Sequence, residues 1–450
     1  TYSHNAERLV ARYGEAIRYC KAAGTWYIYD GMRWRPDVLD AVMEFAKTTA
    51  RGIHTEAADA DDPREQRAKG KHAVASQSKT KLRSMIDLAQ SIPQVAVRPE
   101  NFDSRRDLLN TPNGTLNLTT FELQAHDPAD LLTVITSAPY DPEARNDLWE
   151  DFLSRTTGGS PELQAFLQRA VGYTLSGRCS EEVCFYAYGP TASGKTTFAM
   201  ALLAALGDGY GRSANFDTFL RRDAPTIYDD LARLVGARFV AAMETRDGAT
   251  FNEGLLKSLT GRDPVTVRHL YQAWFTYVPQ YVIWFGANMR ARVAADDAAI
   301  WRRIIQLPFS NSVPAAERDP ELKERLQDCR TCGAAILRWA IDGLKEWQRR
   351  RLAIPDGVRR ATDEYQASQN PAADFVDDCC VRADTAWASS TALWEAYQHW
   401  AQGGGLKYPL TFRRFSRALE GMGCVPDRRG TPQQRGWAGV GLLAEGAQDT

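Results

Sequence analysis

The chain has 450 residues, an ordinary apolar content of 44%, and nearly balanced charge, with 55 Lys and Arg against 56 Asp and Glu. This balance excludes a globally basic nucleic-acid binder, so any DNA contact must come from local patches. No apolar stretch approaches the length of a membrane span, and the N-terminus lacks a signal-peptide pattern. We therefore expect no membrane partner and a cytoplasmic location, in a bacterial host. The eight cysteines have no framework spacing, which favours reduced thiols.

The first 140 residues are predicted to form a helical and small-β N-terminal region. The expected elements are a helix over residues 5–22, a strand–turn–strand at 26–34, an exposed loop at 57–71 and short strands separated by turns over 96–140, clearest at 111–118. Trp26 and Trp34 are expected in the core of this region. The acidic cluster of Glu56, Asp59, Asp61 and Asp62 indicates a solvated loop and does not resemble a primase carboxylate pair. Helices are expected from 148 to 177.

Residues 189–196 read G-P-T-A-S-G-K-T, the G-x-x-x-x-G-K-T pattern of a phosphate-binding loop. An apolar stretch at 183–188 predicts a buried strand before it, and a strong helix former at 197–206 follows and stops at Gly207. Strand, glycine loop and helix together indicate a nucleotide site. Lys195 supplies charge for the β- and γ-phosphates and the Thr196 hydroxyl ligates magnesium, so ATP and Mg²⁺ are the expected cofactors. The predicted nucleotide-binding residues are Gly189, Pro190, Thr191, Ala192, Ser193, Gly194, Lys195, Thr196 and Thr197.

Two later apolar strands end in polar residues that suit the same site. The strand at 238–244 ends in Glu244, which is predicted to hold the metal, polarise the attacking water, or do both. The strand at 281–288 ends in Asn288, which is predicted to hold the attacking water or sense the γ-phosphate. Arg302 and Arg303 precede one more strand, and an arginine there could reach a neighbouring subunit's ATP as a finger. Strand-end amides and surface arginines are common, so a plain structural role stays open for Asn288 and both arginines.

The C-terminal part carries local positive charge. A helical segment at 320–352 and a linker bracketed by Pro355 and Pro371 lead to helices at 390–402 and 411–419. Arg413, Arg414 and Arg417 lie on one side of the second helix, and Arg428, Arg429 and Arg435 decorate a predicted β-wing before Trp437. Clustered arginines are the expected footprint of phosphate contact, although a solvated helix face or a protein-docking module remains open. Cys329, Cys332, Cys379 and Cys380 lack zinc-ligand spacing.

The order of these motifs resembles that of the superfamily 3 helicases, and within them the phage and plasmid primase–helicases, the group that includes the poxvirus primase–helicase. In the core, the resemblance rests on the phosphate loop, the strand ending in Glu244, "NEGLLKSLTGRD", a hairpin predicted at 265–277 from its alternating ends, the strand ending in Asn288, and "DDAAIWRRIIQLPF". Outside it, "NAERLVARYG", "WYIYDGMRW" and "LLNTPNGTLNL" are similar to that family's N-terminal region.

The resemblance implies an α/β fold, with an AAA+ P-loop NTPase core, a helical and mixed N-terminal region and a C-terminal winged-helix domain. The expected divisions are 1–140 for the N-terminal region, 141–180 for a helical oligomerisation segment, 181–310 for the core, 311–370 for a helical lid and linker, and 371–450 for the DNA-binding winged helix.

The family also implies a hexameric ring that moves on single-stranded DNA, typically 3′ to 5′. Lys195 and Thr196 would bind phosphate and magnesium, Glu244 would be the acidic motif and metal ligand, and Asn288 the sensor. Arg303 would be the finger with Arg302 beside it, and Lys257 would lie near the phosphates. The implied DNA contacts are Arg268, His269, Tyr271 and Gln272 on the hairpin, and Arg413, Arg414 and Arg417 in the C-terminal domain.

Two departures from the family pattern affect these roles. Glu244 is followed by Thr245, where many relatives have a second acid, and Glu253 or Asp247 would have to assist. The hairpin tip lacks the Lys-His pair of viral relatives, so DNA grip would come from Arg268, His269 and stacking by Tyr271.

The predicted function is a replicative DNA helicase of a phage, plasmid or integrated element, acting on single-stranded and forked DNA. An AAA+ origin-binding initiator or loader that does not unwind is the alternative, and a catalytically idle scaffold is a third reading. A primase or polymerase is a possible partner. We find no primase active site in this chain, and because it begins with Thr1 we expect that such a domain would lie upstream in the same polypeptide.

Overall fold

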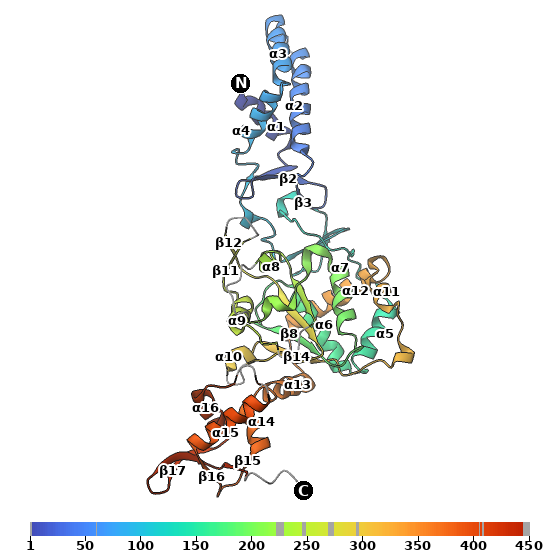
Figure 1. The fold of residues 1–450 in the computed structure, drawn as a ribbon. Coiled ribbons are helices and arrows are strands. Elements are labelled where there is room, and N and C mark those ends of the chain that lie inside the picture. Colours follow the sequence, from blue (N-terminus) through green and yellow to red (C-terminus); the bar gives the residue numbers. More distant parts are fainter. Residues whose placement is uncertain are drawn as a thin grey trace.

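The computed structural model describes residues 2–59, 61–221, 229–244, 249–268, 274–293, 297–404, 406 and 409–443. Three parts follow one another along the long axis: an N-terminal helical region, a central part built on a parallel sheet, and a C-terminal domain at the opposite end (Figure 1). Separate clusters of buried hydrophobic side chains form the cores of the N-terminal and C-terminal parts, and two clusters cover the two faces of the central sheet. None of the helices in these described ranges is long and apolar enough to cross a bilayer.

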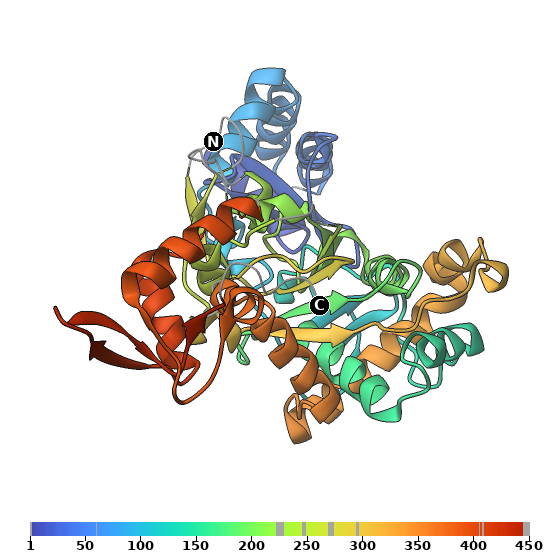
Figure 2. The ribbon, with the colours of Figure 1, turned by 60° about the horizontal axis from the view of Figure 1, so that its bottom comes forward.

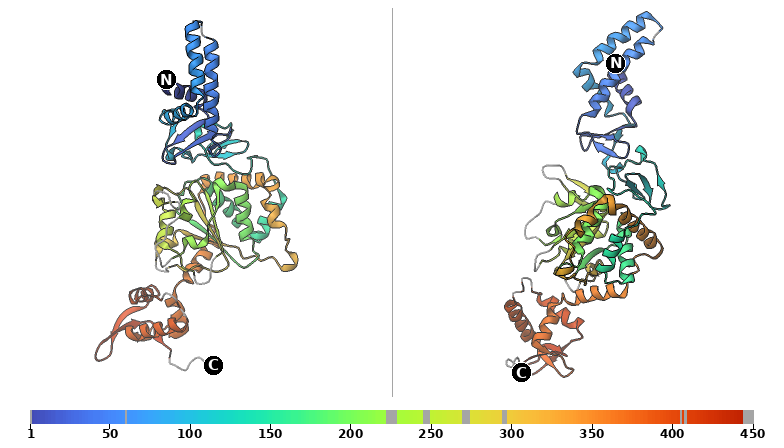
Figure 3. Two further views of the ribbon diagram at one scale, coloured as in Figure 1. Left: turned by 45° about the horizontal axis from the view of Figure 1, so that its top comes forward. Right: turned by 90° about the vertical axis from the view of Figure 1, so that its right-hand side faces the viewer.

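The N-terminal region combines four helices with a small sheet. The helices are α1 (Tyr2–Tyr13), α2 (Ala41–Ala58), α3 (Pro63–Ser76) and α4 (Lys79–Ala89). The sheet has the order β3-β2-β1-β4 and comprises β1 (Ile17–Cys20), β2 (Thr25–Tyr29), β3 (Trp34–Pro36) and β4 (Ala96–Val97). The helices α2 and α3 form a hairpin that projects away from the central part (Figure 3). Trp26 and Trp34 are buried, as predicted.

Two sequence predictions for this region are wrong. The helix expected over 5–22 ends at Tyr13, and residues 17–20 form β1 instead, where Ile17 and Tyr19 suit a strand that pairs with β2 and β4. The loop expected over 57–71 is mostly helical. The Asp62 carboxylate accepts a hydrogen bond from the Arg64 amide, and Pro63 stands at the first helical position, so this polar stretch begins α3 rather than a loop.

A second small sheet joins the N-terminal region to the central part. It has the order β5-β6-β7, with β5 (Leu108–Thr111), β6 (Gly114–Asn117) and β7 (Leu123–Gln124). Its first two strands pair as a hairpin in the region where short strands and turns were predicted. The Asn110 side chain donates to the carbonyls of Met32 and Val134, and its backbone amide donates to the Tyr210 hydroxyl. Short 3₁₀ turns lie at Pro99–Asn101 and Pro128–Asp130.

The central sheet is parallel throughout, with the order β14-β8-β13-β10-β9. Its strands are β8 (Cys184–Tyr188), β9 (Gly211–Ser213), β10 (Phe239–Met243), β13 (Val282–Ala287) and β14 (Ile304–Pro308). Their near-continuous burial is typical of a sheet covered on both faces. The parallel α/β core confirms the coarse fold class expected from the sequence.

Helices and short elements surround this sheet. Their bounds are α5 (Asp147–Thr156), α6 (Pro161–Leu175), α7 (Lys195–Tyr210), η3 (Phe216–Phe219), α8 (Asp229–Ala232), α9 (Glu253–Thr260) and α10 (Ala298–Trp301). A separate hairpin consists of β11 (Val265–Val267) and β12 (Phe275–Tyr277), as predicted. The helix after the phosphate loop is interrupted at Gly207, where the sequence predicted its end, but continues to Tyr210.

The chain then packs a long helix onto α6. It passes through η4 (Ala315–Glu317), α11 (Leu322–Gln327) and a π-helical turn at Cys329–Gly333 into α12 (Ala334–Arg350). The two helices approach closely at two glycines. A Cβ on Gly172 would lie 2.0 Å from the Leu344 amide nitrogen, and one on Gly343 would lie 1.9 Å from the Gln168 carbonyl oxygen. This crossing therefore requires glycine on both helices.

A helix replaces most of the linker expected between Pro355 and Pro371. Pro355 caps α13 (Asp356–Ala367), which packs on the edge strand β14. The Gln306 amide donates to the Thr362 hydroxyl at 3.0 Å, and its side chain donates to the Ala361 carbonyl at 2.9 Å. The Tyr365 hydroxyl donates to the Ala291 carbonyl, just beyond β13. The linker prediction is wrong because the buried side chain of Gln306 gives α13 its partners.

The C-terminal domain has its own core. Its elements are α14 (Pro371–Cys379), β15 (Cys380–Val381), β16 (Trp387–Ser389), α15 (Ser390–Gly403), α16 (Phe412–Gly421), β17 (Val425–Arg429), β18 (Gln434–Ala438) and β19 (Gly441–Leu442). The buried core of this domain includes Phe375, Tyr397, Phe415 and Trp437. Trp437 lies within β18, whereas the sequence predicted that it would follow the wing. The β17–β18 hairpin extends outward from the domain (Figure 2).

Candidate nucleotide-binding site

A cavity of about 540 Å³ lies at the carboxyl ends of β8, β13 and β10. It is lined by residues 191–197 of the loop and α7, by Glu244, and by residues 286–289 after β13. Crevices at this edge of an open parallel sheet are where such folds bind ligands, and the volume suits a nucleotide. The structure therefore brings the phosphate loop, Glu244 and Asn288 into one site, as the order of motifs predicted.

Lys195 stands at the start of α7 with its ammonium turned back onto the loop. Its Nζ donates to the carbonyls of Gly189 and Pro190, at 2.8 and 2.7 Å, and to the Ser193 hydroxyl at 3.0 Å. Burial lowers the pKa of this ammonium below its ordinary value. The Lys195 ammonium is thus held by neutral oxygen atoms. Phosphate oxygens are stronger acceptors and would compete with them for this ammonium.

The phosphate loop packs closely against α5 and against the segment after β14. Gly194 adopts φ +90°, and a Cβ there would lie 2.6 Å from the Thr156 hydroxyl of α5. A Cβ on Gly189 would lie 1.9 Å from the Phe309 carbonyl oxygen. The segment after β14 also holds the loop, because Ser312 donates to the Thr191 carbonyl at 2.8 Å and the Val313 amide donates to the Ala192 carbonyl at 3.1 Å. No sequence motif predicts these contacts, which come from segments far from the loop along the chain.

Glu244 and Asn288 follow neighbouring strands. Glu244 is exposed and has φ +69°, a left-handed conformation that costs a non-glycine residue about 1–2 kcal/mol. Its amide donates to the Gly286 carbonyl at 2.8 Å. The Asn288 side-chain amide donates to the Thr191 hydroxyl at 3.3 Å, which links the end of β13 to the phosphate loop. Strained backbone at a cavity is a mark of functional positions.

The donors in the cavity fit a magnesium ion. Thr196 offers a hydroxyl oxygen and Glu244 a carboxylate oxygen, the hard ligands that Mg²⁺ prefers. No cluster of three or more His, Cys, Asp or Glu side chains suited to a metal occurs among the described residues. Nucleotide-bound magnesium takes few protein ligands and completes its shell with phosphate and water, so this donor set is sufficient.

Arg302 and Arg303 do not line this cavity in their own chain. Arg303 is 8% exposed, donates to the Ala299 carbonyl at 2.6 Å and pairs with Glu182 at 3.2 Å. The Arg302 side chain is 65% exposed and reaches the same Glu182 oxygen at 3.5 Å. Of the two, Arg302 is the more accessible to a neighbouring molecule.

Lys257, which we expected near the phosphates, does not line the cavity of its own chain. Its ammonium forms an ion pair with Asp297. The same carboxylate caps α10 by accepting from the amides of Ala299 and Ile300. The prediction fails within one chain because Asp297 fixes this lysine at the start of α10.

The predicted DNA-contact residues are only partly described. His269, Tyr271 and Gln272 lie outside the described residues. Arg268 follows β11, and its guanidinium lies 4.8 Å from the centre of the Trp274 ring. Trp274 is 55% exposed, and the sequence reasoning missed it. Arg413, Arg414 and Arg417 are exposed on α16, opposite the buried Phe415 and Leu419.

Two family models match the chain. One described as "D5 N terminal like" matches residues 6–158, and one described as "Poxvirus D5 protein-like" matches residues 367–422.

Curated relatives come from large DNA viruses. "Putative helicase L207/L206" of Acanthamoeba polyphaga mimivirus is 25% identical over 307 residues, which cover 63% of this chain and 32% of the relative. "Putative helicase 022R" of Frog virus 3 is 24% identical over 297 residues, covering 62% and 30%. The chain thus spans about a third of the length of these relatives.

A solved structure, the A form apo structure of the NrS-1 C terminal region, has a TM-score of 0.51 and 8% identity over 96% of this chain and 98% of that one. At this identity the likeness concerns the fold alone. The resemblance drawn from the motifs agrees with the family-model matches at both ends, with the named relatives and with the cavity at the phosphate loop. The chain is therefore a relative of the primase–helicase family that includes the poxvirus D5 protein.

Proposed function

We propose that this chain is the motor of an ATP-driven replicative DNA helicase of superfamily 3, from a phage, plasmid or integrated element. The observation that carries the proposal is the single cavity in which Lys195, Glu244 and Asn288 meet. The loop strand β8 and the Glu244 strand β10 lie on either side of β13, so that all three groups line one cavity. The names of the viral relatives support the same activity.

Each group in the cavity has a defined task in ATP hydrolysis. Lys195 leaves its loop carbonyls for the β- and γ-phosphates, and the loop amides hold the remaining phosphate oxygens. Thr196 and Glu244 would hold the magnesium, which would neutralise phosphate charge. Glu244 also orients the attacking water and accepts its proton, and Asn288 fixes the position of that water. A single carboxylate thus serves both tasks.

The site is completed by a second copy of the chain. In one chain neither Arg302 nor Arg303 lines the cavity, although their type and position suit the stabilisation of transferring phosphate. A ring in which each subunit supplies these arginines to its neighbour accounts for this separation. We therefore propose a hexameric ring that translocates 3′ to 5′ on single-stranded DNA.

Two elements are proposed to contact DNA. The β11–β12 hairpin lies on the core, where it would line the ring's channel through Arg268, His269, Tyr271 and Gln272. The C-terminal domain runs α14, β15, β16, α15, α16, β17, β18, β19, and β15 and β19 form a separate two-stranded sheet. The remaining elements follow the order expected of a winged helix, in which α16 would be the recognition helix. Its exposed Arg413, Arg414 and Arg417 would bind phosphate.

Strand displacement tests the proposal most directly. A 3′-tailed fork with ATP and magnesium is incubated with the parent chain, with Lys195→Ala, and with Lys323→Ala, which removes an exposed lysine on α11. We expect unwinding by the parent and the Lys323 variant and none by Lys195→Ala. A parent chain that hydrolyses ATP but never displaces a strand on any fork would overturn the helicase assignment and favour the initiator or loader.

A further inference from the structure

We propose that the outer face of α3, in the projecting N-terminal hairpin, binds the phosphate backbone of duplex DNA. This surface lies outside the motor, and neither the hairpin of the core nor α16 is part of it. The inference rests on the proposed function and extends it by naming a third DNA-contacting element, but it does not require ATP hydrolysis.

Positive charge is concentrated in this part of the chain. Residues 63–83 contain seven Lys or Arg residues and one acid, Glu65, within a chain whose formal net charge is −1. Such a local excess in a neutral protein is the footprint of a partner that carries dense negative charge.

Three of these residues form one stripe. Arg64, Arg67 and Lys71 are three and four residues apart, so they lie along one face of α3, and all three are exposed. The buried residues of the helix, Ala73 and Ser76, lie on the opposite face. The stripe of Arg64, Arg67 and Lys71 therefore points to solvent over a length of roughly 10 Å along the helix.

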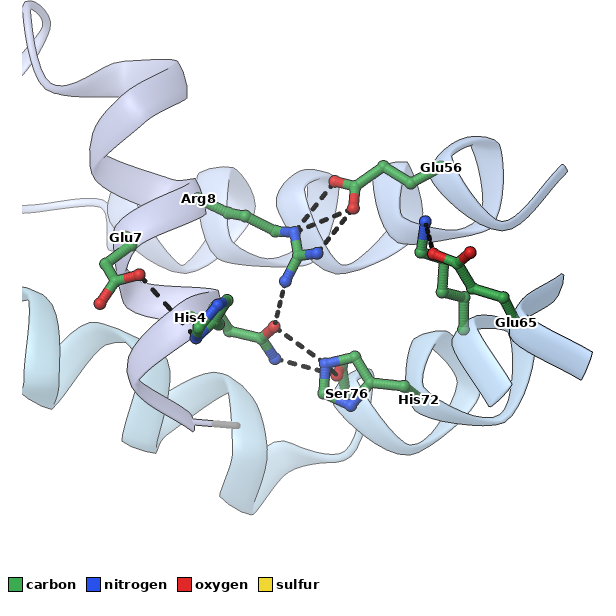
Figure 4. Close-up of polar contacts among 9 residues, drawn as sticks. His4, Glu7, Arg8, Glu56, Glu65, His72 and Ser76 are labelled. Carbon is green, nitrogen blue, oxygen red and sulfur yellow. Dashed lines mark hydrogen bonds and ion pairs between the residues drawn. The ribbon is translucent and has the colours of Figure 1, made fainter. Parts of the chain in front are cut away.

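Two of the acids near the stripe pair with basic side chains outside it, whereas Asp59 and Asp61 are exposed. Glu65 pairs with Lys69 at 2.8 Å, and Glu56 of α2 pairs with Arg8 of α1 at 2.7 Å (Figure 4). Asp62 accepts from the Arg64 amide as the helix cap. In the part of the chain that the structure describes, no ion pair within 4.0 Å involves the stripe. Its three charges are thus left for a partner.

A buried polar network holds α3 in place. The Asn5 side chain of α1 donates to the Ser76 hydroxyl at 2.9 Å, and its oxygen lies 3.1 Å from Nε2 of His72 (Figure 4). Asn5 and Ser76 are 3% and 1% exposed, so the contact is protected from water. A rigidly mounted stripe loses little conformational freedom on binding.

The stripe is long enough to reach several phosphates of a regular nucleic-acid duplex. One strand of duplex DNA carries a phosphate every 3.4 Å of axis, so a stripe of roughly 10 Å spans about three phosphates. A duplex keeps this spacing along its length, whereas a single strand does not, and a straight helix cannot follow a changing spacing. The hairpin also projects from the end of the molecule opposite the C-terminal domain (Figures 1 and 3). The duplex arm of a fork is the partner that these features fit.

Salt-dependent binding tests the inference on the full chain without nucleotide. A fluorescein-labelled 24-base-pair duplex is titrated with the parent, with the triple variant Arg64→Gln, Arg67→Gln and Lys71→Gln, and with a control triple Lys323→Gln, Arg349→Gln and Arg350→Gln, whose residues are exposed on the core. Glutamine preserves helix propensity. Each phosphate contact contributes about 0.9 to the slope of log affinity against log salt.

We expect the slope of the stripe variant to be smaller by about 2.7. The ratio of the parent's affinity to that of the stripe variant should therefore fall about 40-fold between 50 and 200 mM salt. The control triple should keep the parent slope, and both variants should keep the parent's circular dichroism. An unchanged slope in the stripe variant, or a loss confined to a 24-nucleotide single strand, would overturn the inference. Unwinding is measured separately, so a chain that never unwinds but shows the stripe-dependent slope loses the helicase assignment and keeps this surface.

Discussion

Arg302 and Arg303 bond to the same carboxylate oxygen of Glu182, at 3.5 and 3.2 Å, yet their side chains are 65% and 10% exposed. One carboxylate thus holds two arginines in unlike surroundings. Arg303 is tied into its own chain by a further bond to the Ala299 carbonyl, whereas Arg302 points outward. The pair divides into an arginine that stabilises the turn before β14 and one that is free to extend.

Alanine substitution should separate these two roles. We predict that Arg302→Ala lowers ATP turnover by about 10³ without changing the melting temperature, because an exposed ion pair adds little stability. Arg303→Ala should lower turnover and also melt at a lower temperature, since it removes a buried contact. Both variants should still bind nucleotide. Full turnover in both would remove the finger role, and mixing either with Lys195→Ala should restore some activity if sites are shared between subunits.

Gly194→Ala should abolish nucleotide binding. The substitution places a Cβ 2.6 Å from the Thr156 hydroxyl and puts a non-glycine residue at φ +90°. Gly254→Ala is the matched control, because a Cβ there meets only the Asn252 side chain, at 3.7 Å. Titration with a fluorescent ATP analogue measures the effect. If Gly194→Ala binds nucleotide as well as Gly254→Ala does, then the loop does not need its present conformation.

Two substitutions at Glu244 should both lower ATP turnover, and the glycine variant should also be more stable. Glu244→Gln should keep ATP binding and lose at least 100-fold in turnover, because the proton acceptor is removed. Glu244→Gly should lose turnover too, but unfold at a higher temperature, since glycine relieves a left-handed backbone that costs about 1–2 kcal/mol. Steady-state ATPase assays and thermal melts give the two readouts. Retained turnover in Glu244→Gln would assign the catalytic base elsewhere.

His72 should make the N-terminal helices sensitive to acid. Burial, and then nearby positive charge that includes Arg8, lowers its pKa below the ordinary value of 6.5. Because the folded state holds the neutral imidazole more tightly than the unfolded state does, the stability it contributes is complete above that value and is lost as the pH falls below it. Melts at pH 7.5, 6.5 and 5.5 should show a smaller acid loss for His72→Gln than for the parent. An identical loss would place the acid sensitivity elsewhere.

Trp274 should contribute to single-strand binding by stacking. We predict that Trp274→Ala weakens binding of a short single strand by about 1–3 kcal/mol with an unchanged salt slope, and that Trp274→Phe recovers most of it. Arg268→Gln should instead lower the slope by about 0.7, the share of one phosphate contact on a single strand. Anisotropy titrations across salt concentrations distinguish the two. A change of slope in Trp274→Ala would contradict the stacking role.

The sequence predicted those parts of the site that depend on local spacing. The phosphate loop has a fixed pattern, and parallel strands bring their carboxyl ends to one edge, so Glu244 and Asn288 could be placed beside Lys195 in advance. The support of the loop could not be predicted, because Thr156 and Ser312 are distant in sequence and carry no motif.

The errors in the fold have one physical origin. Residues 17–20 join a sheet, the polar stretch after Ala58 becomes α3, and the segment after Pro355 becomes α13, each because of partners elsewhere in the chain. Local composition predicted a helix, a loop and a linker at these places. Tertiary pairing and capping therefore decided the conformation where local preference was weak.

The segment after β13 connects the phosphate loop to α13 through a series of contacts. Asn288 touches the phosphate loop, Arg290 lies over the rings of Tyr188 and Tyr365, at 4.6 and 5.5 Å, and the Ala291 carbonyl accepts from the Tyr365 hydroxyl. The same helix leads directly into the C-terminal domain. The Asn288 amide is thus joined by one short series of contacts to α13, the helix that precedes the C-terminal domain.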